Sequence, residues 1–455
     1  MRQPVVVILG HVDSGKCVSG ETLLQLADGR ISRAKELFEK HKSGSPHQTP
    51  DGVAYPAAGL DLLSVSSGGA IVKRSASYVW KLKSDRLVRV TTRAGNGLET
   101  TPEHRFLVFQ PDGRVEYVEA ERLRVGDRLA VPPSCPVVAW TTQGVKAELL
   151  SRLPRAFLIR PDAHLLARIE KLCRERGIEG VAEKVGDKDL GEHLREGHFR
   201  ADAYRALASL CGVSNSVAYD HIKRVKFASP RVGGRSSFWL KVPKSERELL
   251  SAYYLVGLLF GDGVGGRACL SNASLSLVRE CRASLRRAFG VPASAVWRRT
   301  SYVVAHRGSR TFSEFLVSAF GCPRAGRTRI ATLPDVVTSA PDAFSAAFLT
   351  GLFDAEGWVE KGKSLGISME SPDLMRRLPM LLQRFGILAY YAKEASKDGL
   401  VIGGATNLAA FSASIGFRAP EKAHLLETAK AKALPDRVFG AAPPAPRHAG
   451  RACPR

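Results

Sequence analysis

The stretch that decides the fold is Leu255-Val256-Gly257-Leu258-Leu259-Phe260-Gly261-Asp262-Gly263, which returns as Leu349-Thr350-Gly351-Leu352-Phe353-Asp354-Ala355-Glu356-Gly357. The acids Asp262 and Glu356 stand 94 positions apart. Three more landmarks recur at nearly the same offset: Ser271 and Ser274 with Ser368 and Ser371, Phe289-Gly290 with Phe385-Gly386, and Gly321 with Gly416. An offset kept across four landmarks predicts two copies of one fold of about 95 residues.

Each nine-residue motif reads as an apolar helix with a glycine near its middle and an acid at its end. Small residues let two helix backbones approach closely, so we expect the two helices to pack along a common seam. Asp262 and Glu356 would then lie side by side and would repel each other unless a cation lay between them. Paired carboxylates that hold a divalent metal beside a basic surface indicate a phosphodiester hydrolase. The alternative is two buried helices whose terminal acids are merely exposed.

The two motifs resemble the LAGLIDADG motif of homing endonucleases. The resemblance implies a pseudo-twofold αββαββα fold over residues 246–430, Mg²⁺ bound by Asp262 and Glu356, and hydrolysis of double-stranded DNA. The sequence departs from the motif at Phe260-Gly261, where Asp-Ala is usual, and at Glu356, where Asp is commoner. In this family a strand lysine helps to polarise the scissile phosphate or to order the attacking water. Lys393 is the candidate for that role, with Lys397 second and Arg298 or Arg299 in the other half.

The charge balance independently points to a polyanion as partner. The chain has 67 Lys and Arg against 44 Asp and Glu, a formal net charge of +23, and nucleic acid is the usual partner of so basic a protein. Between positions 281 and 310 there are seven arginines and no acid. The expected strands 295–299 and 302–306 would carry several of them into a major groove, and the predicted DNA contacts here are Arg282, Arg298 and Arg299.

Residues 141–245 form a second basic region that is rich in helical patterns. Apolar residues at helical spacing over 203–210, a turn at 211–214 and a second helix over 217–222 suggest a helix-turn-helix. Lys223, Arg224 and Lys226 come directly after it and are predicted to contact DNA, since a run of one sign of charge is costly without a polyanion. The alternative is an ordinary helical hairpin with a solvated basic loop.

Residues 17–140 read as β-rich, with a short helix capped by Ser32 and a loop over 43–59. The segment begins at Cys17, contains Thr101-Pro102-Glu103-His104 and ends near Val125-Gly126-Asp127. These features resemble the N-terminal part of the splicing (Hint) domain of inteins. The resemblance implies that the Cys17 thiol attacks the Lys16 carbonyl to form a thioester, while His104, assisted by Thr101, protonates the leaving nitrogen.

The first sixteen residues differ in character from the rest of the chain. An apolar run over 4–9 is typical of a buried parallel strand, and residues 10–16, with Gly10, Gly15 and Lys16, match the phosphate-binding pattern G-x-x-x-x-G-K. Cys17 stands where that pattern requires Ser or Thr. The first sixteen residues resemble the GTPase start of archaeal translation initiation factor 2, and they imply that an intein interrupts such a gene. Sixteen residues are too few for a GTP-binding domain.

The intein resemblance also implies a C-terminal His-Asn pair, which this chain lacks, so we expect the splicing fold to be partial and residues 431–455 to be disordered. The eight cysteines form no C-x-x-C pair, which argues against a zinc ribbon or a disulfide framework. No apolar run approaches the length of a membrane span.

The sequence therefore predicts a cytoplasmic, monomeric, multidomain α+β protein: a splicing domain followed by a Mg²⁺-dependent endonuclease that acts on DNA. Two alternatives stay open. One is a DNA-binding remnant without cleavage activity. The other is a GTP-binding initiation factor, which only the first sixteen residues indicate.

Overall fold

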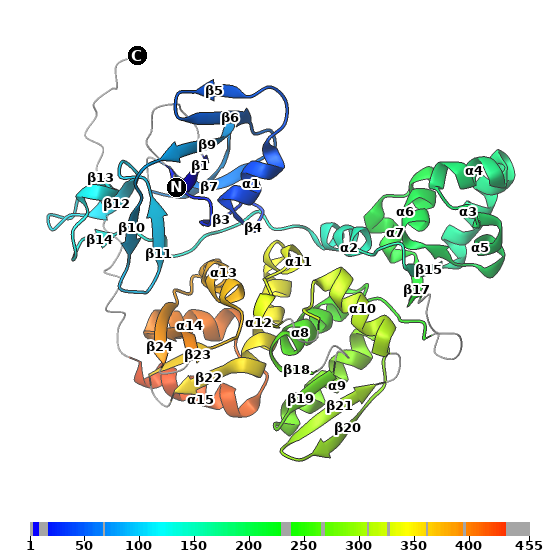
Figure 1. Ribbon diagram of the computed structural model, residues 1–455. Coiled ribbons are helices and arrows are strands. Elements are labelled where there is room, and N and C mark those ends of the chain that lie inside the picture. The colour runs from blue at the N-terminus through cyan, green and yellow to red at the C-terminus, as the bar shows by residue number, and fades with distance from the viewer. Residues whose placement is uncertain are drawn as a thin grey trace.

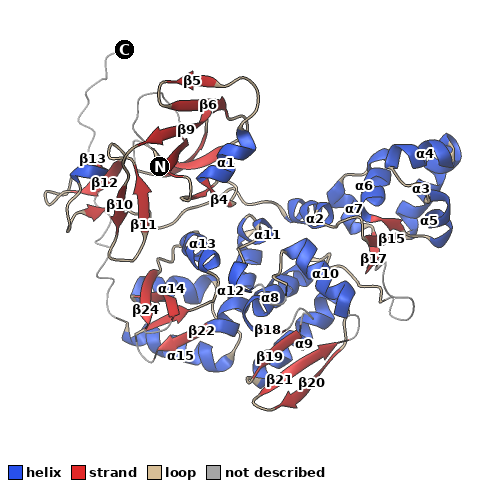
Figure 2. Ribbon diagram, viewed as in Figure 1, coloured by secondary structure: helices blue, strands red, loops and turns tan. Residues whose placement is uncertain are grey.

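The computed structural model describes residues 3–8, 17–66, 69–228, 238–264, 269–306, 309–324, 328–360, 363–394 and 397–433. Figures 1 and 2 show a β-rich part near the N-terminus, a helical lobe, and a mixed part in which helices cover two sheets. The fold class predicted from the sequence, α+β with several parts, is confirmed. Within the described ranges, no helix has both the length and the apolar character that crossing a bilayer requires.

The β-rich part holds a seven-stranded sheet of order β10-β11-β2-β1-β9-β6-β5, a three-stranded sheet of order β13-β12-β14, and the pairs β3-β4 and β7-β8. Its elements are β1 (Gln3–Ile8), β2 (Val18–Ser19), β3 (Leu23–Gln25), β4 (Ile31–Arg33), α1 (Ala34–His41), β5 (His47–Thr49), β6 (Gly52–Pro56), β7 (Asp61–Val65), β8 (Ile71–Ser75), β9 (Tyr78–Ser84), β10 (Val88–Thr91), β11 (Gly97–Thr100), β12 (Arg105–Phe109), β13 (Val115–Glu119), the 3-10 helix η1 (Ala120–Arg122) and β14 (Arg128–Leu129).

Three details of this part differ from the sequence-based expectations. The run over residues 4–9 is not a parallel strand, because β1 pairs antiparallel with β2 and β9. The cap of α1 is Arg33 rather than Ser32, since Glu36 accepts the Arg33 backbone N–H at 2.9 Å. The expected loop over 43–59 contains β5 and β6, which extend the sheet from β9. The Gly, Pro and Ser residues of this segment favoured the prediction of a loop, although the segment forms two short strands.

The helical lobe comes next along the chain, and Figure 1 shows it projecting to one side of the molecule. Its elements are α2 (Thr142–Ser151), β15 (Phe157–Pro161), α3 (Ala163–Arg176), α4 (Ile178–Val185), α5 (Leu190–Glu196), β16 (Phe199–Arg200), α6 (Ala201–Leu210), α7 (Asn215–Asp220) and β17 (Ile222–Phe227). The three strands form a sheet of order β16-β15-β17. Helices α6 and α7 meet at the predicted turn. The second helix has the expected length but begins and ends two residues earlier than expected, because Ile222 already pairs with Pro161 in the sheet.

The mixed part consists of two halves that repeat one order of elements. The first half is α8 (Glu246–Asp262), β18 (Gly263–Val264), β19 (Cys269–Asn272), α9 (Leu275–Phe289), β20 (Ala293–Arg298), β21 (Ser301–His306) and α10 (Ser309–Phe320). The second is α12 (Asp342–Glu356), β22 (Gly357–Glu360), β23 (Ser364–Ile367), α13 (Pro372–Gln383), β24 (Tyr390–Glu394), β25 (Lys397–Gly403) and α14 (Ala405–Ser414). The 3-10 helix η2 (Thr328–Ile330) and α11 (Asp335–Thr338) join the halves, and α15 (Pro420–Lys432) ends the described chain.

The two sheets have matching strand orders, β18-β19-β21-β20 and β22-β23-β25-β24. The αββαββα order that the family resemblance implies is therefore confirmed in both halves. Helix α15 runs to Lys432, so the first two residues of the expected disordered tail are helical, and residues 434–455 lie outside the described ranges.

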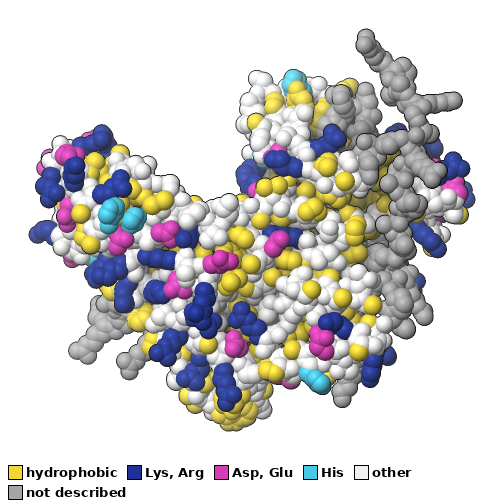
Figure 3. All heavy atoms as spheres, turned by 180° about the vertical axis from the view of Figure 1, so that it is seen from behind, with side chains coloured by type: hydrophobic (Ala, Val, Ile, Leu, Met, Phe, Trp, Pro, Cys, Tyr) yellow, Lys and Arg dark blue, Asp and Glu magenta, His cyan; other side chains and the backbone are white. Residues whose placement is uncertain are grey.

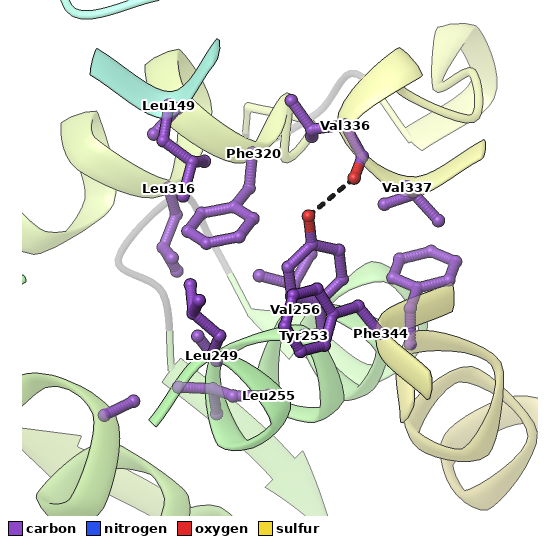
Figure 4. Packing of buried hydrophobic residues seen from close by; sticks show 14 of the residues in the cluster. Leu149, Leu249, Tyr253, Leu255, Val256, Leu316, Phe320, Val336, Val337 and Phe344 are labelled. Atoms are coloured by element: carbon purple, nitrogen blue, oxygen red, sulfur yellow. Dashed lines mark hydrogen bonds between the residues drawn. The ribbon is translucent and has the colours of Figure 1, made fainter. Parts of the chain in front are cut away.

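One hydrophobic core joins the lobe to both halves of the mixed part. Figure 4 shows its centre, where Tyr253 of α8 lies among side chains from α2, α10, α11 and α12. The Tyr253 hydroxyl donates to the Val336 carbonyl at 2.6 Å, and its ring stacks on Phe344 at a centroid distance of 5.2 Å. Since a buried hydroxyl costs free energy unless it is paired, this bond fixes how α11 sits over the two long helices.

Candidate functional site

Helices α8 and α12 cross at their motif glycines. A Cβ atom added to Gly257 would lie 2.0 Å from the Phe348 carbonyl oxygen, and one added to Gly351 would lie 2.1 Å from that of Tyr254. Neither position has room for a side chain, and each helix presses its glycine against the backbone of the other. The seam predicted from the repeated motif is present.

The seam brings the C-terminal ends of both helices together. A Cβ atom at Gly261 would lie 2.7 Å from Cγ of Glu356, so Asp262 and Glu356 end neighbouring helix termini. The carboxylate of Asp262 accepts a hydrogen bond of 2.6 Å from the Asn272 side-chain amide, and the Asn272 oxygen accepts the Ser274 backbone N–H at 2.7 Å. Burial raises the pKa of Asp262, and the bond from Asn272 partly opposes this shift. The site thus holds a carboxylate in an environment that disfavours its charge.

Lys422 of α15 is a site residue that the sequence reasoning missed. Its Nζ donates to the carbonyls of Phe353 at 3.1 Å and Asp354 at 2.5 Å, at the end of α12. Burial lowers the pKa of Lys422, whereas the nearby carboxylates, among them those of Asp262 and Glu356, raise it. A cation in this position favours the charged form of both motif acids. The sequence distinguishes Lys422 from the other lysines only by its place at the start of a helix.

Asp354, two positions before Glu356, is fully buried and has a different environment. It accepts hydrogen bonds from the Tyr254 hydroxyl at 2.9 Å and from the backbone N–H groups of Arg418 and Ala419 at 3.2 Å. Burial raises its pKa, and these donors oppose the shift. Because three donors occupy its oxygens, Asp354 ties α12 to α8 and to the start of α15 rather than offering a ligand.

The donor set at the seam fits a divalent cation. In the described part of the chain, no group of three or more His, Cys, Asp or Glu side chains is arranged to hold a metal. Mg²⁺ characteristically binds through only one or two carboxylates and completes its octahedron with water and substrate phosphate oxygens. Asp262 and Glu356 at adjacent helix ends match that requirement.

The predicted DNA contacts of the first half fall on two kinds of element. Arg298 ends β20, and Arg299 comes next in the hairpin turn with a positive φ of 53°. Arg282 instead lies on α9, and its Nε donates to the Ala293 carbonyl at 2.9 Å. Lys393 and Lys397 belong to the antiparallel pair β24-β25, but their side chains lie outside the described residues.

The basic residues that come after α7 lie on strand β17. Lys223 and Arg224 are exposed and Lys226 is half-buried. Helix α7 has six residues, of which Ala218 and Tyr219 are buried, and its Asp220 pairs with Lys146 of α2 at 2.7 Å. Figure 3 shows Lys and Arg side chains gathered over the lobe and over the lower body on this side of the molecule.

A second cluster lies in the β-rich part around Cys17. The Thr101 side chain bonds the Cys17 thiol, and the Thr101 backbone N–H donates to the Cys17 carbonyl at 3.1 Å. The His104 N–H donates to the Thr101 carbonyl at 3.1 Å, which sets His104 one tight turn away. Burial raises the pKa of Cys17 to about 11, so the thiol is neutral at physiological pH. Gly10, Gly15 and Lys16 lie outside the described residues.

Known proteins that are similar to this chain indicate its family. Residues 343–416 match the family described as LAGLIDADG-like domain. Over 94% of its length, the chain is 31% identical to elongation factor 2 of Methanopyrus kandleri and 26% identical to a probable translation initiation factor IF-2 of Thermococcus kodakarensis. It spans about a third of each of these proteins, 33% and 35% respectively.

Among solved structures, the chain is similar to the TvoVMA intein, with 32% sequence identity over 26% of this chain and 69% of that one and a TM-score of 0.23. Residues 343–416 therefore carry a LAGLIDADG-like domain, and part of the chain is similar to an intein.

Proposed function

We propose that the two halves of the mixed part form a divalent-cation-dependent endonuclease that cleaves double-stranded DNA. The observation that carries the proposal is the adjacency of Asp262 and Glu356 at the ends of two helices that cross at glycine. A bound Mg²⁺ would supply Lewis-acid stabilisation of the charge that develops on the scissile phosphate. Asp262 and Glu356 would hold it, and Asn272 would fix the orientation of the Asp262 carboxylate.

The remaining residues in this proposal supply positive charge. Lys422 lies beside the two acids, and its positive charge opposes the effect of burial on the Asp262 carboxylate. Lys393 stays the candidate for ordering the attacking water or polarising the phosphate. Arg298 and Arg299 would contact the DNA at the β20-β21 hairpin, and Arg282 would support that hairpin from α9. Phosphate contacts of this kind position the duplex, whereas base contacts select its sequence.

The DNA target is inferred from the place of the chain in its relatives. The chain matches translation factors over 94% of its length but spans only about a third of each. We therefore propose an intein inserted after Lys16 in a translation factor gene, as the phosphate-loop pattern over residues 10–16 indicates. The duplex to be cleaved is the uninterrupted form of the same gene.

The test uses a plasmid that carries the uninterrupted host gene across the codons of the phosphate-loop pattern. Wild-type protein with Mg²⁺ is expected to linearise it, and Asp262→Asn and Glu356→Gln are expected to bind but not cut. Asp335→Asn is the matched control, because Asp335 is also a carboxylate whose pKa is raised by burial but lies on α11, outside the seam. Full cutting by either seam variant would refute the site. Binding without cutting by the wild-type protein would instead support a DNA-binding remnant.

A second function is favoured by the contact of Thr101 with Cys17. In the proposed step, the Cys17 thiol releases its proton to solvent and Sγ bonds to the Lys16 carbonyl carbon, the Lys16–Cys17 C–N bond breaks, and the released amine takes a proton from His104. The product is a thioester. Mass spectrometry after incubation with a free thiol tests this step: release of residues 1–16 that Cys17→Ala prevents supports it, and equal release from Cys17→Ala refutes it.

A further inference from the structure

We propose that the solvent face of the sheet β16-β15-β17 is a binding surface for the phosphate backbone of duplex DNA, distinct from the seam. The surface consists of Arg160 on β15, Arg224 and Lys226 on β17, and Trp239, which follows β17 in the sequence. The inference rests on the proposed function in assuming that this chain acts on DNA. To the lobe contacts Arg224 and Lys226 predicted from the sequence, it adds a defined sheet face and two residues, Arg160 and Trp239, that no motif identifies.

Strand register places the cations on one side of this sheet. Arg160 lies directly opposite Arg224, and Leu158 lies opposite Lys226. The alternate residues Phe157, Ile159 and Val225 are fully buried in the core. Because successive side chains of a strand point to opposite faces, the cations share the face that is turned away from the core.

All three cations converge on Trp239. The Arg160 guanidinium carbon lies 4.5 Å from the centre of its ring and the Lys226 Nζ lies 5.8 Å from it. Arg224 donates to the Trp239 carbonyl at 3.2 Å. The neighbouring Leu240 exchanges two backbone hydrogen bonds with Val225, at 2.7 and 2.8 Å, which fixes Trp239 at the sheet edge.

Within the described residues, no ion pair involves Arg160, Arg224 or Lys226. The nearby acids are engaged elsewhere: Glu196 bonds His198 at 3.1 Å, and Asp189 faces Arg200 at 4.0 Å. Like charges directly opposite each other on neighbouring strands are destabilising. The Trp239 ring offsets part of that cost through cation–π attraction. A polyanion would offset the rest, and this is the physical reason to expect one here.

Two observations favour duplex DNA over other polyanions. Single-stranded nucleic acid binds by stacking bases on open aromatic faces, but Arg160 and Lys226 already lie over the Trp239 ring. Strand β17 also continues to the first half of the mixed part. The Phe227 N–H donates to the Thr311 hydroxyl of α10 at 3.3 Å, and the Arg310 guanidinium lies 5.5 Å from the centre of the Phe227 ring. The lobe sheet is therefore joined to the half that carries the proposed DNA contacts Arg298 and Arg299, and we propose that one duplex binds both.

The test compares two triple variants of the full chain. Arg160→Ala/Arg224→Ala/Lys226→Ala removes the surface, and Arg174→Ala/Arg176→Ala/Lys184→Ala removes three exposed cations from α3 and α4 of the same lobe. Binding to a labelled duplex of the host sequence is measured in EDTA over a range of salt concentrations. The logarithm of the binding constant falls linearly with the logarithm of the salt concentration, and each lost phosphate contact reduces the steepness of that line by about 0.9. The slope of the first variant is therefore expected to be shallower than that of wild type by about 3, whereas the slope of the control variant should be unchanged.

A charge-preserving variant, Arg160→Lys/Arg224→Lys/Lys226→Arg, is expected to retain most of the affinity and guards against a folding artefact. Equal slopes for wild type and the first triple variant would overturn the proposal, and so would a larger loss for single-stranded DNA than for duplex. Since EDTA prevents metal-dependent cleavage, the result does not depend on catalysis. A wild-type protein that binds no DNA would refute the proposed function itself.

Discussion

Replacing Gly257 by alanine tests whether the helix seam sets both stability and catalysis. The new Cβ would lie 2.0 Å from the Phe348 carbonyl oxygen and 2.8 Å from the Leu352 nitrogen, where ordinary contact begins at 3.4 Å. Both atoms are backbone, so α8 and α12 must separate by about 1.4 Å for contact to become ordinary. Overpacking of this kind costs about 3 kcal/mol, and the helical preference of alanine over glycine returns less than about 1 kcal/mol.

The expected net loss is therefore about 2 kcal/mol, or a fall of about 4–8 °C in the thermal midpoint. Separation of the helices also moves Asp262 away from Glu356. A displacement of about 1 Å in a catalytic constellation can cost about 10²-fold in rate, so plasmid cleavage should fall by a similar factor.

Gly180→Ala is the matched control for this experiment. Gly180 lies within α4, and no atom lies within 4 Å of the added Cβ. Alanine should therefore stabilise the protein there by about 0.5–1 kcal/mol and leave cleavage unchanged. Thermal unfolding measured by circular dichroism, together with a plasmid cleavage assay, gives both numbers. Equal midpoints for Gly257→Ala and wild type would refute the argument that close backbone approach holds the seam.

Three further predictions concern individual residues. Because burial raises the pKa of Cys17 to about 11, thiol-induced release of residues 1–16 should accelerate between pH 7 and pH 10; a rate independent of pH, measured by mass spectrometry, would contradict this. Burial also raises the pKa of Asp262, so its carboxylate destabilises the metal-free fold once pH exceeds the unfolded pKa; Asp262→Asn should raise the thermal midpoint at pH 7, with a difference that vanishes in acid where Asp262 is protonated in both states. Arg299 has a positive φ of 53°, a conformation that costs an L-residue about 1–2 kcal/mol; Arg299→Gly should raise the thermal midpoint while weakening DNA binding, and a lowered midpoint would contradict the strain argument.

The repeat was sufficient to predict two similar halves that meet at a helix seam, whereas the expected endonuclease fold came from the resemblance of the motifs to LAGLIDADG. Gly257 and Gly351 stand at the same motif position, and only a residue without a side chain fits where each helix meets the backbone of the other. The offset of 94 between Asp262 and Glu356 then extends the similarity from the motifs to the two whole halves, because the strands and helices of one half recur in the other in the same order. Local patterns also gave β20 and β21 to within two residues, since alternating side chains and an arginine-rich turn bracket the hairpin.

Residues that reach the sites from distant segments could not be predicted in this way. Lys422 comes 66 positions after Glu356 and reaches the seam only because α15 folds back over the end of α12. Arg160 stands opposite Arg224 through strand pairing across 64 positions. With 67 Lys and Arg in the chain, charge alone selects neither of them. Contacts between distant segments place Lys422 and Arg160 at the two sites, and the periodicity of the sequence carries no signal for such contacts.

The interface between the β-rich part and the second half also has no sequence signature, yet it links the two candidate sites. Arg377 of α13 donates to the Ile31 carbonyl, and Arg33 pairs with Asp373 at 2.5 Å. On the other side of the interface, the Tyr391 N–H of β24 donates to the Ala94 carbonyl at 2.8 Å.

Ala94 belongs to the turn between β10 and β11, and a Cβ added to Gly95 of this turn would lie 2.7 Å from that of Tyr391. At the far end of the same hairpin, Thr100 pairs with Val18, directly after Cys17. One β-hairpin therefore spans from the thiol to the strand that carries Lys393. Because the Tyr391–Ala94 bond and the close approach of Gly95 join β24 to this hairpin, we expect a change that displaces β24 to disturb the Cys17 cluster as well.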